Sequence, residues 1–427
     1  MTPVELMRAS FDAAVAAADP LQVVAAHLPP QPTGRVLVVG AGKAAASMAL
    51  AVERAWSAVA LEGLVITRYG HGAPTERIRV VEAGHPVPDA AGEGAAREIM
   101  QLVSKMQHGD LLLALISGGG SSLLSLPVPE VSMSSLKSVT RMLLASGAPI
   151  GEMNIVRKHL SQIAGGRLAA AAAQRGAGVV ALMISDVTGD APSDIASGPC
   201  APDPSTYADA LSVLSRWNVN APDDVTAWIQ RGISGSVDET PKPGDPLFEQ
   251  VENRVIATPH RSLEAAAEVF RAAGIPPVLL GDTVTGEARE VAKVYAALVR
   301  EIRAYKSPFK SPVALISGGE CTVTLPHGAT GRGGRCTEFL LSLAVELDRM
   351  PEVYALACDT DGIDGSEDNA GAWLACGSIE AAAVHGVSAR IALDQRDSWG
   401  FFDAADGVIV TGPTRTNVND FRVILVR

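Results

Sequence analysis

Short runs of apolar residues alternate with alanine-rich segments along most of the chain. Nearly every position in the short runs is apolar, which is typical of strands buried on both faces of a sheet. The alanine-rich segments are long enough to form the connecting helices. The predicted strands are 36–39, 63–67, 79–83, 111–116, 179–184, 255–257, 277–280, 313–316, 353–357, 408–410 and 422–426. The predicted helices are one or two within 1–30 and then 44–58, 90–106, 161–173, 262–273, 286–305 and 337–347. This alternation predicts parallel α/β domains.

Two domains are expected, with a boundary near residue 245. Residues 231–249 are rich in glycine, proline and charge and show no hydrophobic periodicity, which is typical of a linker. The predicted domains are therefore 1–245 and 246–427. The sequence Ala-Leu-Ile-Ser-Gly-Gly occurs at 114–119 and again at 314–319, so each domain is expected to place a glycine turn after a buried strand. Six residues are too few to indicate gene duplication.

Composition narrows the classes of function. The 427 residues include 35 Lys and Arg against 47 Asp and Glu, a net charge of −12, which argues against nucleic acid as a partner. The five cysteines lack C-x-x-C spacing, so neither a disulfide framework nor a zinc site is expected. Charged residues near the N-terminus disfavour a signal peptide, and glycines interrupt the longest uncharged run, 111–129. We expect a cytoplasmic protein without a membrane partner; the oligomeric state stays open, a homodimer included.

The first candidate for chemistry is the loop at 40–45, between a predicted strand and a predicted helix. Gly40 and Gly42 let backbone amides approach an anion, and Lys43 adds a positive charge. The glycines also fit a dinucleotide-binding pattern, but the next strand ends in Ile-Thr-Arg at 66–68 without the acid that would hold a ribose. A purely structural turn is the alternative.

Two further loops follow predicted strands. Residues 117–122 contain three glycines between serines, and such a loop can form a nest of N–H groups for phosphate or a sharp turn. The candidate ligand contacts there are Ser117, Gly118, Gly119, Gly120 and Ser121. In the loop 185–199, Asp186 and Asp190 can hold Mg²⁺ or act as a base, with Asx turns or helix caps as the alternative.

The last two loops lie in the second predicted domain. Arg332 and Arg335 stand among glycines before a helix, where guanidinium groups can bind carboxylate or phosphate oxygens in a fork. Asp359, Asp361 and Asp364 follow a predicted strand. Their mutual repulsion is hard to justify without a cation, so we predict a divalent metal or a catalytic base at this turn.

In order along the chain, nine motifs resemble the glycerate 2-kinases of the bacterial and archaeal type that carry a C-terminal MOFRL domain. The motifs are GAGKAAASM, AGHPVPD, ALISGGGSSLL, NIVRKHLSQIAGGRLA, SDVTGDAPSDIASGP, ISGGECTV, GRGGR, DTDGIDG and TGPTRTNVND. The resemblance implies transfer of the γ-phosphoryl group of ATP to the 2-hydroxyl of D-glycerate, with Mg²⁺ or a similar cation. It also implies two α/β domains, the larger N-terminal one Rossmann-like with a mainly parallel sheet, a MOFRL segment at about 310–420, and an active site in the cleft between the domains.

Carried onto this sequence, the resemblance places catalytic roles on Lys43, Arg335 and Asp190. Substrate or nucleotide binding is expected of Gly42, residues 117–121, Arg332 and Asp361, and metal binding of Asp186 and Asp359. Either arginine would bind the glycerate carboxylate. Two positions depart from the usual family pattern, because Cys336 stands where Asn is usual and Ala191 where a second aspartate is common.

Two rival functions remain. The Rossmann-like first loop, followed by Arg68 after the second strand, also fits an NADPH-dependent hydroxypyruvate reductase. The other rival is a protein that binds glycerate or nucleotide without turnover, although five polar loops at strand ends make that reading the weakest.

Overall fold

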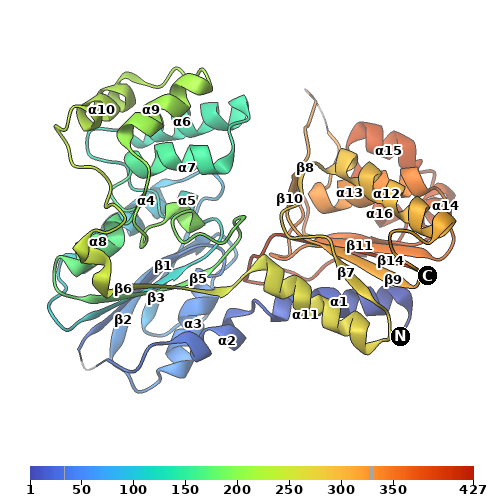
Figure 1. The fold of residues 1–427 in the computed structure, drawn as a ribbon, viewed down its shortest axis with the longest axis horizontal. Coiled ribbons are helices and arrows are strands. Elements are labelled where there is room, and N and C mark those ends of the chain that lie inside the picture. The colour runs from blue at the N-terminus through green and yellow to red at the C-terminus, as the bar shows by residue number, and fades with distance from the viewer. Residues whose placement is uncertain (33, 327, 329) are drawn as a thin grey trace. The chain divides into compact units, whose positions relative to one another are not determined.

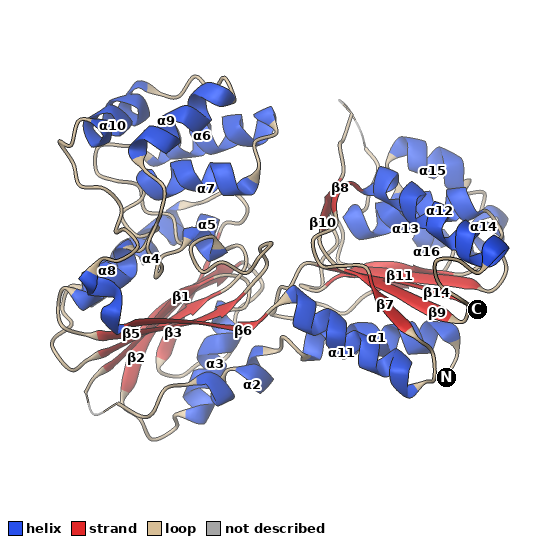
Figure 2. Ribbon diagram, in the orientation of Figure 1, coloured by secondary structure: helices blue, strands red, loops and turns tan. Residues whose placement is uncertain are grey.

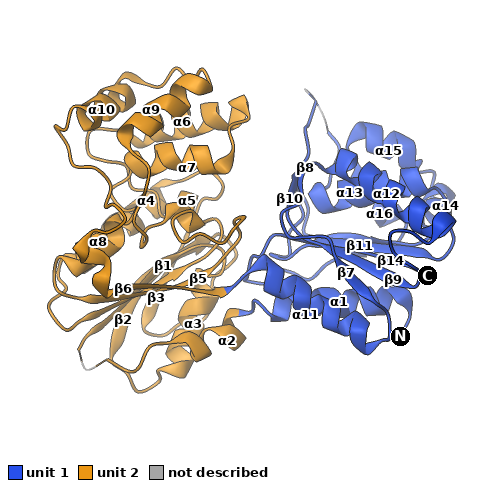
Figure 3. Ribbon diagram, in the orientation of Figure 1, with its two compact units in different colours: residues 1–19, 257–427 blue, residues 20–256 orange. Residues whose placement is uncertain are grey.

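The computed structural model describes residues 1–32, 34–326, 328 and 330–427, which form two compact units (Figures 1 and 3). Unit 1 comprises residues 1–19 and 257–427, and unit 2 comprises residues 20–256. The division differs from the expected one in two respects. The chain passes from unit 2 to unit 1 after Ile256 rather than near 245, because β6 (Val251–Ala257) borders the sheet of unit 2. In addition, the first nineteen residues belong to unit 1, together with the C-terminal part of the chain.

Unit 2 is built on a six-stranded sheet in the order β3-β2-β1-β4-β5-β6, which is the strand order of the Rossmann fold. Strands β1 to β5 pair in parallel, as predicted. Their bounds are β1 (Val36–Ala41), β2 (Leu61–Arg68), β3 (Ile78–Ala83), β4 (Leu111–Ile116) and β5 (Gly178–Ile184). Helices cover both faces, which explains the apolar runs: α3 (Ala45–Ala55) lies on one face, and α4 (Ala90–Val103) and α8 (Arg167–Ala173) lie on the other (Figure 2).

Four helices outside the predicted ones form a separate layer of unit 2. They are α6 (Met133–Ser146), α7 (Ile150–His159), α9 (Tyr207–Arg216) and α10 (Asp223–Ile233). Their shared core includes Leu143, Val156, Tyr207 and Trp228. Short helices α2 (Pro20–Val23) and α5 (Gly120–Leu123) complete the unit. The layer places α6 and α7 beside the loops that follow β4 and β5 (Figure 1).

Unit 1 contains a second six-stranded sheet, in the order β13-β12-β11-β14-β9-β7. The prediction of a parallel sheet is wrong here, because every described pair in this sheet is antiparallel except β7 with β9. The strands are β7 (Pro277–Leu279), β9 (Val313–Ser317), β11 (Val353–Asp359), β12 (Gly371–Leu374), β13 (Val408–Ile409) and β14 (Asp420–Val426). A small parallel pair, β8 (Thr285–Glu287) with β10 (Glu320–Thr322), lies outside this sheet.

Helices cover both faces of the unit 1 sheet, so its central strands are as apolar as those of a parallel sheet (Figure 2). One face carries α1 (Pro3–Ala16) and α11 (Pro259–Ala272). The other carries α12 (Ala288–Tyr305), α13 (Arg335–Leu347), α14 (Ser378–Val384), α15 (Ala389–Gln395) and α16 (Ser398–Ala404). Among the described helices of both units, none is long and apolar enough to cross a membrane.

Helix α1 joins unit 1 because its apolar face is buried there. Met7, Phe11 and Ala14 lie four and three residues apart on one side of the helix and pack into the core formed with α11 and the sheet. The ring of Phe11 lies 5.8 Å from that of Phe421 on β14. Thr2 caps the helix and shares a capping box with Glu5, so the helix starts at a defined residue.

Candidate active site

Three of the predicted loops meet in unit 2. They follow β1, β4 and β5, which are neighbours in a parallel sheet, so their carboxyl ends share one edge. The backbone N–H of Lys43 donates to the carbonyl oxygen of Gly118 (2.9 Å). The hydroxyls of Ser121 and Ser197, from the second and third loops, lie 2.8 Å apart. The structure thus brings together most of the candidates predicted in the N-terminal domain.

Gly42 is required by a close approach between the first two loops. Its φ is +136°, and a Cβ atom built there would lie 2.1 Å from Oγ of Ser117. That Oγ accepts a hydrogen bond from the backbone N–H of Ala44 (3.0 Å). The amides of residues 43 and 44, at the start of α3, therefore donate to the chain's own β4 loop.

Replacing Gly42 by alanine should lower the free energy of unfolding by about 2–4 kcal/mol, because the new Cβ adds both backbone strain and overlap with Ser117. Chemical denaturation monitored by circular dichroism measures the change. Gly94→Ala is the matched control, since Gly94 lies in α4 with no atom within 4 Å of the added Cβ. It should be neutral or slightly stabilising. Equal effects at both positions would contradict the packing argument.

Lys43 is largely buried near His85. It is only 9% exposed, and the imidazole of His85 lies beside the same glycine turn, with Nε2 2.9 Å from the Cβ position of Gly119. Burial lowers the pKa of His85 to about 3, and the charges of Lys43 and Arg68 contribute. His85 is therefore neutral at physiological pH and able to donate or accept one hydrogen bond at each nitrogen. No spacing pattern in the sequence singles out His85.

The third loop supplies two half-buried carboxylates, Asp186 and Asp190. Asp190 adopts a positive φ of 53°, and its N–H donates to the Val187 carbonyl oxygen (3.3 Å). Over the described part of the chain, no group of three or more His, Cys, Asp or Glu side chains is arranged to hold a metal ion. Magnesium usually binds through one or two carboxylates together with substrate phosphates, and Asp186 and Asp190 are the predicted residues of this loop with that chemistry.

The loops predicted in the second domain meet around Arg335 in unit 1. Its Nε donates to Asp420 (2.6 Å), one terminal nitrogen to Asp359 (2.7 Å) and the other to Glu320 (2.5 Å). Burial lowers the pKa of Arg335, but the three carboxylates outweigh it and raise that pKa well above its ordinary value. Arg335 and Asp359, both predicted, are thus an ion pair. Asp420, the first residue of β14, was not predicted. Arg422, two residues later on the same strand, also forms an ion pair with it.

Arg332 and Asp361 have other surroundings. The guanidinium of Arg332 lies over the ring of Trp399, 4.0 Å from its centroid, and its backbone N–H donates to Asp397 (3.1 Å). The carboxylate of Asp361 accepts a hydrogen bond from the N–H of Ile363 (2.9 Å), and its own N–H donates to Asp359 (3.0 Å). Asp361 therefore takes part in the turn that follows β11, whereas Arg332 stacks on an aromatic ring. Their proposed ligand contacts stay predictions.

Asp364 explains how three aspartates share one turn. Its carboxylate points to the start of α13, where it accepts hydrogen bonds from the N–H groups of Cys336 (2.9 Å) and Thr337 (2.8 Å) and from the Thr337 hydroxyl (2.8 Å). Helix N-termini stabilise such groups. Repulsion among the aspartates is thus reduced by a helix end and by Arg335, and a cation is not required to account for it. Burial nonetheless raises the pKa of Asp364 to about 6.

That raised pKa predicts a pH-dependent difference between the protein and its Asp364→Asn variant. The folded protein binds the Asp364 proton more tightly than the unfolded chain, so this group's contribution to stability is complete below about pH 4 and is lost as pH rises through about 6. Relative to the unaltered protein, the variant should gain up to about 3 kcal/mol between pH 4 and pH 7. Urea denaturation of both proteins across this range measures it. A pH-independent difference would contradict the raised pKa.

Comparison with known proteins gives the site a context. Residues 6–230 match the family described as "Domain of unknown function (DUF4147)", and residues 313–420 match the MOFRL family. The "D-glycerate 2-kinase" of Thermotoga maritima is 36% identical over 99% of this chain and 97% of its own length. A protein of Agrobacterium vitis named "Putative hydroxypyruvate reductase" is 49% identical over 99% of this chain and 94% of its own length. The crystal structure of glycerate kinase from Thermotoga maritima matches the whole of both chains at 35% identity with a TM-score of 0.85. The chain therefore belongs to the MOFRL/DUF4147 glycerate kinase family.

Proposed function

We propose that the protein is a glycerate 2-kinase, which transfers the γ-phosphoryl group of ATP to the 2-hydroxyl of D-glycerate. The observation that carries the proposal is the largely buried Lys43 at the junction of three strand-end loops. Phosphoryl transfer needs in-line positioning and neutralisation of charge more than covalent chemistry, and a preorganised cation supplies the second of these. The names of the Thermotoga maritima and Pyrococcus horikoshii relatives support the same activity.

Each candidate residue then has a defined task. Lys43 would hold the phosphoryl oxygens on which negative charge develops. Asp190 would orient the 2-hydroxyl and accept its proton, and Asp186 would hold Mg²⁺ together with phosphate oxygens, where the ion neutralises part of the nucleotide charge. Arg335 would contribute a charge whose direction is set by Asp420 and Asp359.

Hydroxypyruvate reduction is the second candidate, favoured by the name of the Agrobacterium vitis relative and by the Rossmann strand order. It requires the first loop to offer its amides to the pyrophosphate of a dinucleotide. Here the amides of residues 43 and 44 already donate to Gly118 and Ser117. An open phosphate-binding turn of the dinucleotide type is therefore not formed at this point, which favours the kinase.

Incubation with ATP, Mg²⁺ and D-glycerate, followed by phosphorus NMR, tests the proposal. We expect ADP and 2-phosphoglycerate in equal amounts, with the 2-phosphate resonance distinct from the 3-phosphate. A parallel assay with NADPH and hydroxypyruvate should show no loss of absorbance at the NADPH band. Oxidation of NADPH without formation of ADP would replace the kinase by the reductase.

A further inference from the structure

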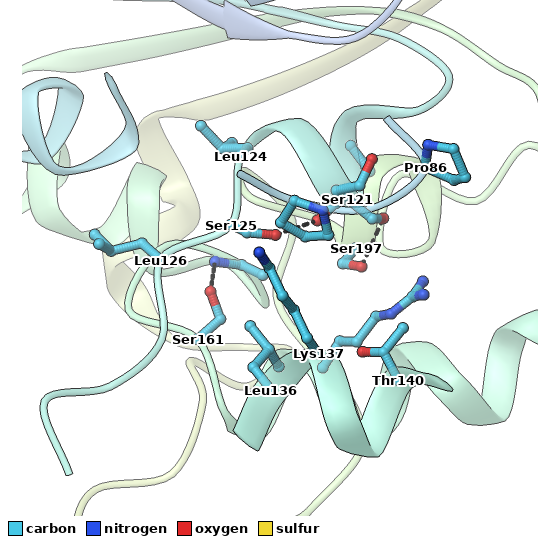
Figure 4. Close-up of a pocket in the computed structure, with 15 residues that line it drawn as sticks. Pro86, Ser121, Leu124, Ser125, Leu126, Leu136, Lys137, Thr140, Ser161 and Ser197 are labelled. Atoms are coloured by element: carbon cyan, nitrogen blue, oxygen red, sulfur yellow. Dashed lines mark hydrogen bonds between the residues drawn. The ribbon is translucent and has the colours of Figure 1, made fainter. Parts of the chain in front are cut away.

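A small pocket in unit 2 is lined by two cations and by six hydroxyl side chains (Figure 4). The cations are Lys137 of α6 and Arg157 of α7. No acidic residue is among the described residues that line the pocket. Its volume for water-sized molecules is about 40 Å³, roughly three times the 10–15 Å³ that one water needs. The pocket is thus too small for a nucleoside but of the right size for a carboxylate or a single phosphoryl group.

Hydrogen bonds connect Arg157 to the glycine-rich loop after β4. Nη1 of Arg157 donates to Oδ1 of Asn154 (3.4 Å), which lies one helical turn earlier on α7. The same oxygen accepts a hydrogen bond from the Ser197 hydroxyl (3.1 Å), and Ser197 lies 2.8 Å from Ser121. The polar wall of the pocket is therefore held by partners on α7 and on the loops after β4 and β5.

The pocket is adjacent to the Lys43 loop. Pro86 and Ser121, which line the pocket, lie one and two residues after His85 and Gly119. At Gly119, the Cβ position is 2.9 Å from Nε2 of His85 and 3.5 Å from the side chain of Lys43. The lining of the pocket is therefore continuous along the chain with the residues that surround the Lys43 side chain.

Among the described residues, no acidic side chain neutralises the two positive charges of the pocket. Within the described residues, neither Lys137 nor Arg157 forms an ion pair, and burial lowers the pKa of Arg157 without an opposing carboxylate. Burying a cation is costly unless an anion or hydrogen-bond acceptors compensate it. Figure 4 shows the Lys137 side chain extending from α6 toward Ser121 and Ser125. A bound anion would be held by both cations and by these hydroxyls, an arrangement typical of charge-assisted recognition.

We propose that this pocket binds the carboxylate of the three-carbon acid substrate. The inference rests on the proposed function and assigns to Lys137 and Arg157 the role that the family resemblance left to Arg332 or Arg335. The hydroxyl-bearing end of the acid then lies toward Lys43, where the phosphoryl group is received.

Calorimetric titration of the full-length protein with D-glycerate, and separately with ATP and with inorganic phosphate, tests the assignment. Arg157→Met and Lys137→Met should each weaken D-glycerate binding by about a hundredfold, the scale of one charged hydrogen-bond partner, and leave ATP binding unchanged. Arg141→Met, on the same helix as Lys137 but exposed and outside the pocket, is the matched control and should leave both affinities unchanged. Thermal denaturation verifies folding, and the half-buried Lys137 provides the test if the Arg157 variant does not fold.

Unchanged D-glycerate affinity in the folded variants would overturn the proposal. Weaker binding of ATP or phosphate with unchanged glycerate binding would also overturn it, because the pocket would then serve a phosphate. Failure of the proposed function is recognised separately, since the unaltered protein would form no ADP. Glycerate binding that depends on Lys137 and Arg157 would support the pocket even then.

Discussion

Replacing Lys43 by alanine should reduce kcat/KM for phosphorylation of D-glycerate by a factor of about 10²–10³, the loss typical of one preorganised electrostatic contact. Lys43 is 9% exposed, so its charge acts where water screens it little. The backbone bond from residue 43 to Gly118 does not involve the side chain, and we expect the fold to be retained. A coupled ADP assay measures the rate, and circular dichroism checks the fold.

Two variants make the Lys43 prediction specific. Lys105→Ala removes an equal charge from an exposed position of unit 2 and should leave kcat/KM within about twofold. Lys43→Arg keeps the charge but presents a larger planar group, so activity between that of the alanine variant and the unaltered protein is expected. Near-normal turnover of Lys43→Ala would rule out a catalytic role for this residue.

Replacing Arg335 by leucine should lower the free energy of unfolding by about 3–5 kcal/mol and abolish most of the kinase activity. The substitution leaves the carboxylates of Asp420 and Asp359 buried without the guanidinium that joins them; their side chains are 0% and 6% exposed. Removing one member of a buried ion pair costs more than the pair contributes, because the remaining charge stays desolvated. Urea denaturation and the ADP assay measure the two effects.

A double substitution separates charge from packing at Arg335. Adding Asp359→Asn to Arg335→Leu removes one of the buried carboxylate charges that the guanidinium had contacted and should recover part of the lost stability, but not the activity. Arg300→Leu breaks a solvent-exposed pair with Glu346 and should change stability by less than about 1 kcal/mol. If Arg335→Leu lowered the free energy of unfolding no more than Arg300→Leu does, the ion pairs around Arg335 would not stabilise the fold.

The fold of unit 2 was predictable because its strands are continuous apolar runs joined by helices. The strand predicted at 111–116 coincides with β4, and the order of the parallel strands brings the loops after β1, β4 and β5 to one edge. The polar residues chosen at those strand ends therefore do come together. The inference from apolar strands to a parallel sheet was wrong for unit 1, where β11 and β14 are equally apolar but antiparallel. An apolar strand indicates burial on both faces and not the direction of its neighbours.

Long-range partners account for the parts of the site that were missed. Nothing near Arg335 in the sequence indicates Asp420, which reaches it only because β14 lies beside β11. The apolar spacing of Leu136, Val139 and Leu143 in α6 was present, yet the cationic pocket depends on how α6 and α7 pack together. Asp364 resembled a metal ligand because a helix cap and a metal site use the same carboxylate chemistry at a turn.

The chain passes from unit 1 to unit 2 and back again, which affects the order in which its parts can fold during synthesis. Residues 20–256 form unit 2 without interruption, so this unit can fold while the ribosome is still translating the remainder. Helix α1 precedes unit 2 in the chain but packs against α11 and β14, so its apolar residues Met7 and Phe11 have no final partners until those elements have been translated. A nascent chain thus carries an exposed amphipathic helix while unit 2 is being translated, which makes α1 a natural point for chaperone capture.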